Sequence, residues 1–248
     1  MATTRPLTWR ERRAAAKPAR RSVYAFEAPV RIVHWTVVVC IIVLSITGFY
    51  LEHPFQTGGS TPGHPGFTLG YMRFIHEVAA FVFIGAVLFR IYWAFVGNRY
   101  THWRGLLPVT KEQRRDLSET CRFYAFMRPR PVKLNGHNPL AGIAYVTLYV
   151  LFLITILTGL GLYAWLLRRP PWTTLFSWTW SVVSVPELRL IHFVLMFLYI
   201  AFAVHHVYSA VLFDLEEHNG EMSSIFSGWK ANLLEGEPPR DEVNEARR

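Results

Sequence analysis

Of the ten histidines, His34, His76, His192 and His206 stand inside long apolar stretches of the chain, as does His205, the neighbour of His206. An ionisable side chain in such a stretch is costly to place and therefore indicates a functional site. Neutral imidazole is a good ligand for haem iron, zinc and copper. The first four of these residues are the first candidates for chemistry, and the chemistry that they suggest is metal binding.

The spacing of two of these histidines places them on one face of a helix. His192 and His206 are 14 residues apart, and 14 steps of about 100° return to within about 40° of the starting direction. The same 14 residues cover about 21 Å along the helix axis. His205 lies 13 residues after His192 and points about 140° away, so we favour His206 over His205 as a ligand.

Four apolar stretches are long enough to be the helices that position these histidines. They cover residues 30–51, 71–96, 140–167 and 188–213, and none contains an internal proline. Each exceeds the roughly 20 residues that a helix needs to cross a hydrocarbon core. The sequence therefore predicts an all-α fold, an integral membrane four-helix bundle.

The distribution of positive charge predicts the orientation of this bundle. Eight Lys and Arg residues lie in residues 1–31 and nine lie in residues 97–139, whereas residues 52–70 contain none. Short loops that are rich in Lys and Arg stay on the cytoplasmic side. We therefore expect both termini and the middle loop to be cytoplasmic. The expected parts are a basic lead-in (1–23), a transmembrane domain (24–214) and a polar cytoplasmic tail (215–248).

The composition fits a membrane protein and argues against other classes. Hydrophobic types make up 52% of the chain and charged types 17%, with a net charge of +9, and so apolar a chain is not intrinsically disordered. Its two cysteines, Cys40 and Cys121, are too few for a disulfide scaffold. For the arginines of the aromatic-rich middle loop we expect membrane lipid as the partner, and no nucleic acid.

The predicted orientation gives each histidine a depth. His76 and His192 fall at the outer face and His34 and His206 at the inner face, so each level holds two histidines from different helices. Zinc takes three or four protein ligands, and the only further donor is Glu77, about 100° around the helix from His76. Two imidazoles instead suit the two axial positions of a haem. No CxxCH motif is present, so we predict two non-covalent, b-type haems.

Other residues are candidates for contacts with these haems. Gly48 lies 14 residues after His34, on the same face at the outer level, where a small residue would leave room for a macrocycle. Arg31, Arg73 and Arg90 are candidates to pair with haem propionates. The alternative for each is ordinary, because glycine is common in membrane helices and arginine near a helix end can reach the interface.

Five strings of the sequence resemble a known family. They are FEAPVRIVHW (26–35), GYMRFIH (70–76), RIYWAFVGNRY (90–100), GHNPLA (136–141) and HVY (206–208). The chain resembles the b-type cytochrome subunit of membrane-bound nickel–iron hydrogenases, within a wider group of four-helix dihaem cytochromes. The haem ligands of that family fall on His34, His76, His192 and His206.

The resemblance implies a function in electron transfer. It implies a multi-pass protein of the bacterial cytoplasmic membrane that anchors the small and large subunits of a nickel–iron hydrogenase at the outer face. Such a subunit takes electrons from the iron–sulfur small subunit and delivers them through haem to a membrane quinone, with no hydrogen chemistry of its own.

We expect electrons to pass from the outer to the inner haem, near which quinone would bind. The polar candidates for proton uptake there are unranked: Tyr100, His102, His137, Glu27 and Asp214. Two alternatives remain open. One is the cytochrome b subunit of another membrane dehydrogenase such as formate dehydrogenase, and the other is a metal transporter or assembly factor that uses histidines.

Overall fold

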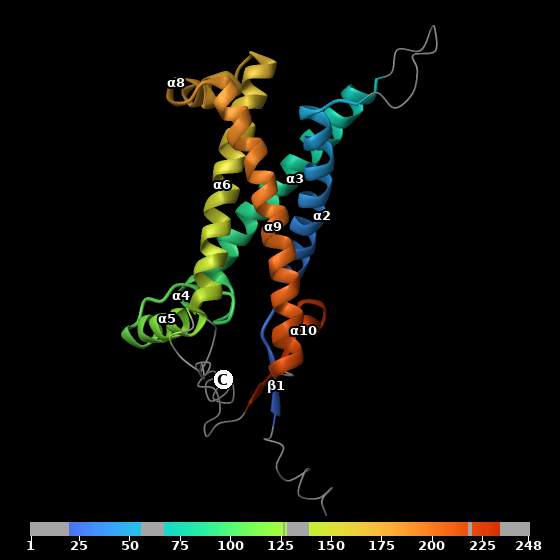
Figure 1. Cartoon of the computed structure of the whole chain (residues 1–248). Coiled ribbons are helices and arrows are strands. Elements are labelled where there is room, and N and C mark those ends of the chain that lie inside the picture. The colour runs from blue at the N-terminus through green and yellow to red at the C-terminus, as the bar shows by residue number, and fades with distance from the viewer. Residues whose placement is uncertain (1–19, 56–66, 126, 128–138, 218–219, 234–248) are drawn as a thin grey trace, which may run out of the picture. The chain divides into compact units, whose positions relative to one another are not determined.

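A computed structural model describes residues 20–55, 67–125, 127, 139–217 and 220–233. Four of its helices are long and apolar enough to cross a membrane. They are α2 (Ala28–Glu52), α3 (Thr68–Val96), α6 (Pro139–Leu167) and α9 (Val185–Glu217) (Figure 1). The prediction of an all-α fold with four spans is confirmed, and each helix extends up to four residues beyond the predicted span.

Prolines mark the beginning of three of these helices. Pro29 lies in the first turn of α2, Pro139 begins α6, and Pro186 is the second residue of α9. Proline fits the first turn because its missing N–H would have no partner inside the helix there. The apolar runs that follow continue until polar or glycine residues end them, as Gly97 does for α3.

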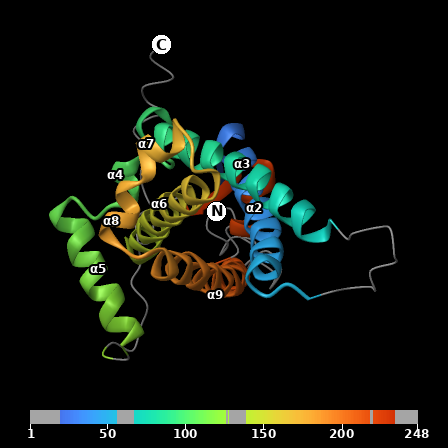
Figure 2. The same ribbon diagram turned by 90° about the horizontal axis from the view of Figure 1, so that it is seen from above.

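The four long helices pack around a small shared core. This core combines residues of all four helices: Val33, Val37 and Cys40 from α2, Phe83, Ala86 and Val87 from α3, Phe152 from α6, and Leu195 and Tyr199 from α9. Figure 2 shows the helices arranged side by side when seen from above. Many of their large apolar side chains are exposed, as Ile32 and Val204 illustrate, which is what a surface in contact with lipid requires.

Short helices occupy the two connections that the structure describes after α3. The middle connection contains α4 (Trp103–Leu106) and α5 (Lys111–Tyr124), and the connection before α9 contains α7 (Trp172–Phe176) and α8 (Trp178–Val182). Thr110 and Gln113 each accept a hydrogen bond from the backbone N–H of the other, a capping box that begins α5.

The termini form a separate unit. Residues 1–26 and 208–248 form one compact unit, and residues 27–207 form the other. Within the terminal unit, β1 (Arg20–Tyr24) pairs antiparallel with β2 (Trp229–Leu233), and α10 (Glu221–Ser227) precedes β2. Gly228 joins α10 to β2 at a φ of +88°, and a Cβ there would meet Tyr24 and the oxygen of Phe26. This sheet was not predicted from the sequence, because it joins two segments at opposite ends of the chain.

Candidate functional site

The structure brings the four selected histidines together as two pairs. His76 on α3 faces His192 on α9, with ring centroids 6.4 Å apart. His34 on α2 faces His206 on α9, also at 6.4 Å. The pairing is the one predicted from depth, and α9 supplies one histidine to each pair. We call them the outer pair (His76 and His192) and the inner pair (His34 and His206).

The separation within each pair fits two ligands on one metal. An imidazole nitrogen binds a metal at about 2.0 Å and lies about 1.1 Å from its ring centroid, so two rings on opposite sides of one metal have centroids about 6.2 Å apart. Both observed separations are 6.4 Å. Among the described residues, no group of three or more His, Cys, Asp or Glu side chains could hold a metal ion. The two imidazoles of each pair would therefore suit a haem, which takes two protein ligands, better than a zinc site.

A threonine holds each ring of the outer pair. Thr47 Oγ1 lies 2.8 Å from His76 Nδ1, and Thr158 Oγ1 lies 3.0 Å from His192 Nδ1. Each hydroxyl donates its own proton to a backbone oxygen one turn earlier, that of Val43 or Ile154. Each threonine oxygen must then accept from Nδ1–H of the histidine. This fixes the tautomer that leaves Nε2 unprotonated and able to bind a metal.

A glycine stands behind each of the same two rings. A Cβ at Gly48 would lie 3.2 Å from His76 Cε1, and a Cβ at Gly159 would lie 3.0 Å from His192 Cε1. Such contacts are tighter than ordinary van der Waals packing. The structure thus places Gly48 against His76, where a small residue lets α2 approach the ring. Its predicted contact with a macrocycle stays a prediction.

The inner pair has different neighbours. His34 Nδ1 is buried and has no hydrogen-bond partner among the described residues. The ring of His206 stacks on Phe202 at 5.6 Å and meets the ring of Tyr145 edge-on at 6.1 Å. His205 is exposed; the choice of His206 over His205 as a ligand stays a prediction.

The three arginines lie at different places relative to the pairs. Arg73 is exposed on α3, one turn before His76, and Arg31 is half-buried on α2, one turn before His34. Arg90 donates to the backbone oxygen of Thr101 at 3.3 Å. Their pairing with propionates stays a prediction.

An aromatic layer lies between the two pairs. Phe152 is 1% exposed and contacts Phe83, Tyr199 and Tyr149, with ring centroids 5.0 to 5.5 Å apart. Tyr199 is seven residues from both histidines of α9, about 10 Å along the helix axis from each. Packed rings therefore lie at a depth about midway between the two pairs.

A carboxylate joins the beginning of α2 to the end of α3. Glu27 Oε2 accepts hydrogen bonds from Trp93 Nε1 at 2.9 Å, from the backbone N–H of Asn98 at 3.1 Å and from Thr101 Oγ1 at 3.4 Å. The turn that supplies two of these donors needs Gly97, because a Cβ there would clash with Trp93 and Thr101. Two of the strings that carry the family resemblance, 26–35 and 90–100, are therefore in direct contact.

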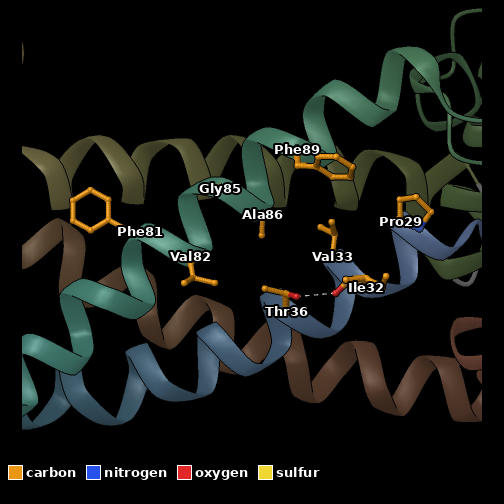
Figure 3. Close-up of a pocket in the computed structure, with 9 residues that line it drawn as sticks. All are labelled: Pro29, Ile32, Val33, Thr36, Phe81, Val82, Gly85, Ala86 and Phe89. Atoms are coloured by element: carbon orange, nitrogen blue, oxygen red, sulfur yellow. Dashed lines mark hydrogen bonds between the residues drawn. The ribbon is translucent and has the colours of Figure 1, made fainter.

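A groove of about 490 Å³ runs between α2 and α3 but includes none of the four histidines (Figure 3). Its lining is apolar except for the hydroxyl of Thr36, which donates to the backbone oxygen of Ile32 at 2.9 Å. Ile32, Phe81 and Phe89 in this lining are exposed. The groove thus belongs to the apolar surface of the helices and offers no group for metal binding.

The two threonines and Gly159 were not among the residues predicted from the sequence. A signal for them does exist, because a Thr-Gly pair occurs in the first span and again in the third. Thr47 and Thr158 are each the twentieth residue of their helix. Both helices run in the same direction by the predicted topology, so the repeated pair falls at one depth. Only the folded arrangement shows that each pair meets a histidine of another helix.

Comparison with known proteins gives a consistent result. Residues 25–228 match the family described as prokaryotic cytochrome b561. A protein of Cupriavidus necator named as a probable Ni/Fe-hydrogenase B-type cytochrome subunit is 33% identical over 216 residues, which cover 85% of this chain and 87% of the relative. The relative of the same name from Rhodobacter capsulatus is 35% identical, over 84% of this chain and 81% of its own length. A probable Ni/Fe-hydrogenase 1 B-type cytochrome subunit of Escherichia coli K12 is 33% identical, over 85% and 92%.

Proposed function

This chain belongs to the prokaryotic cytochrome b561 family and is an integral membrane cytochrome that binds b-type haem; from this premise we propose that it is the membrane-anchoring dihaem subunit of a nickel–iron hydrogenase. In this role it transfers electrons from the iron–sulfur small subunit to membrane quinone. It performs no hydrogen chemistry itself, and it resides in the bacterial cytoplasmic membrane.

The observation that carries this proposal is the presence of two histidine pairs with the same separation between their rings. Two pairs of imidazoles, each with centroids 6.4 Å apart, would supply two ligands to each of two haems. On α9, 14 residues separate the two ligands, about 21 Å of helix, which is most of a hydrocarbon core of about 30 Å. Haem bound at each level gains and loses one electron at a time, so the chain would connect the two faces of the membrane.

The residues around each pair have separate tasks in this proposal. Thr47 and Thr158 orient the outer rings so that Nε2 faces the metal, and the aromatic layer at Phe152 excludes water between the levels. The names of the relatives favour a hydrogenase as the partner. We place its small and large subunits on the outer face, beside the outer pair, and membrane lipid around the helices.

We place quinone near the inner pair, where its reduction takes up protons from the cytoplasm. Of the polar candidates there, Glu27 already accepts three hydrogen bonds. His102 Nδ1 accepts one from the backbone N–H of Arg104. His137 lies outside the described residues, and Asp214 belongs to the terminal unit.

A haem assay on the purified full-length chain tests the proposal. We expect a reduced-minus-oxidised spectrum with b-type bands, and pyridine extraction should yield two haems per chain. The substitutions His76→Ala and His192→Ala should each remove one haem, and the same one. His205→Ala is the matched control, because this exposed neighbour of a ligand should leave both haems in place.

The possible outcomes separate the alternatives. A chain without haem that binds a divalent metal would favour the transporter or assembly factor and would refute the proposal. A variant such as His76→Ala that retained both bands would refute the assignment of the outer pair. Co-purification with a formate dehydrogenase in place of a nickel–iron enzyme would keep the haems and change the partner.

A further inference from the structure

The second ring nitrogens of both outer histidines contact a threonine, whereas that of His34 in the inner pair does not. In the outer pair both Nδ1 atoms have a threonine oxygen within 3.0 Å. In the inner pair His34 Nδ1 is buried without a hydrogen-bond partner among the described residues. The difference is built into the helices, because Thr47 and Thr158 are themselves buried, 4% and 7% exposed.

Thr47 and Thr158 are stronger hydrogen-bond acceptors than an ordinary neutral hydroxyl group. Thr47 Oγ1 donates to the backbone oxygen of Val43 at 2.7 Å, and Thr158 Oγ1 donates to that of Ile154 at 2.9 Å. A hydroxyl that donates its proton becomes a better acceptor, and such chains strengthen further where water is excluded. Each outer imidazole therefore gives its Nδ1–H to a polarised oxygen.

A hydrogen bond from the far nitrogen changes the ligand strength of an imidazole. Partial removal of the Nδ1 proton makes Nε2 a stronger electron donor to a metal. A stronger donor stabilises ferric iron more than ferrous iron, and therefore lowers the reduction potential of the haem.

We infer that Thr47 and Thr158 are positioning residues that lower the reduction potential of the haem on the outer pair. The inference rests on the proposed ligation of haem by His76 and His192. Its consequence is a bias: the lower the potential of the outer haem, the more readily that haem would pass its electron to the inner level. The hydroxyl groups of Thr47 on α2 and Thr158 on α6 would then favour the proposed direction of electron flow.

A potentiometric titration of the purified, haem-loaded full-length chain tests this inference. Thr47→Val and Thr158→Val keep the side-chain size and remove the hydroxyl acceptor, while the ring of His192 keeps its hydrogen bond to the backbone oxygen of Thr155. We expect each to shift the ferric-to-ferrous ratio at a given potential by about tenfold, the lower end of the effects of outer-shell partners. That change raises one midpoint potential by about 59 mV for a one-electron couple. Both variants should move the same one of the two components.

Two control variants separate the hydrogen bond from general disturbance. Thr47→Ser retains a hydroxyl and should keep the wild-type midpoint. Thr36 makes the same kind of bond to a backbone oxygen on the same helix, to Ile32 at 2.9 Å, but has no bond to a histidine, so Thr36→Val should change neither midpoint. If Thr47→Val fails to assemble, Thr158→Val reports on the same haem from the other ring.

Each possible result supports or refutes either the inference or the proposed function. One component raised in both valine variants, with Thr47→Ser and Thr36→Val unchanged, supports the inference. Two haems present with no midpoint change in either valine variant would overturn it and leave the proposed function standing. Equal shifts of both components would also overturn it. A wild-type chain without haem would refute the proposed function itself.

Discussion

At the scale of single residues, the outer pair depends on side chains that are not ligands. Thr47 and Thr158 accept from the Nδ1–H of His76 and His192, and the glycine that follows each threonine leaves the ring its place. Each Thr-Gly dipeptide therefore contacts its histidine ring at two places, because neighbouring residues on a helix point about 100° apart. The threonine meets Nδ1 of the ring, and the adjacent backbone approaches Cε1.

The glycines give a prediction at this scale. Gly48→Ala and Gly159→Ala place a Cβ 3.2 and 3.0 Å from a ring carbon, so each ring must move by a few tenths of an ångström. We expect about tenfold weaker retention of the outer haem, measured as haem per chain during purification. Gly85→Ala on α3 is the control, because no atom lies within 4 Å of its Cβ position. Full haem content in both Gly48→Ala and Gly159→Ala would contradict this role.

At the scale of elements, the pairing of α2 with α3 is secured at one end by Glu27. The carboxylate precedes the first turn of α2 and accepts from three donors on α3 and the turn after it. Arg90, on the last two turns of α3, donates to Thr101 in the same turn. The contact fixes the end of α2 from which His34 projects two turns later.

Removal of this carboxylate should loosen the two helices. We expect Glu27→Ala to lower the free energy of unfolding by about 2 kcal/mol, since hydrogen bonds to a charged group contribute about that much. Thermal unfolding in detergent would measure the loss, and Glu27→Gln should cause a smaller one. The control is Glu52→Ala, which removes an exposed ion pair to Arg189 at 2.8 Å that is worth about 1 kcal/mol or less. A melting temperature for Glu27→Ala no lower than that of Glu52→Ala would count against the contact.

At the scale of the whole molecule, the distribution of charge predicts which side of the membrane each connection faces. The middle connection, with α5, carries nine Lys and Arg residues when counted over residues 97–139, and the first outer connection carries none over residues 52–70. The proposed direction of electron flow across the membrane depends on this orientation, because it decides which histidine pair would meet the proposed partner.

The two native cysteines allow a direct test of orientation. Cys121 is exposed in α5, and Cys40 is buried in the core. We expect a membrane-impermeant maleimide to label Cys121 in inverted membrane vesicles and not in intact spheroplasts, and Cys121→Ser to abolish the labelling. Val182→Cys, an exposed position at the end of α8, should show the opposite pattern in the Cys121→Ser background. Labelling of Cys121 in spheroplasts would reverse the predicted topology.

The sequence by itself determined the four spans and the four histidines. Hydrocarbon thickness sets a minimum length for an apolar helix, and a helix repeats at a fixed angle, so the spans and the shared face of His192 and His206 follow from counting. It could not show which side chains on other helices meet those histidines. Thr47, Thr158 and Gly159 lie 29 to 34 residues from their partners in sequence, and no local pattern encodes such a distance.

Only the tertiary structure decided those contacts, as well as the bond from Glu27 to Trp93 across 66 residues and the pairing of β1 with β2 from opposite ends of the chain. The reason is physical. Burial in a membrane constrains each helix separately, whereas a hydrogen bond between helices depends on how two helices are rotated and placed relative to each other. That placement results from the packing of all four helices around the shared core and is a property of the folded molecule.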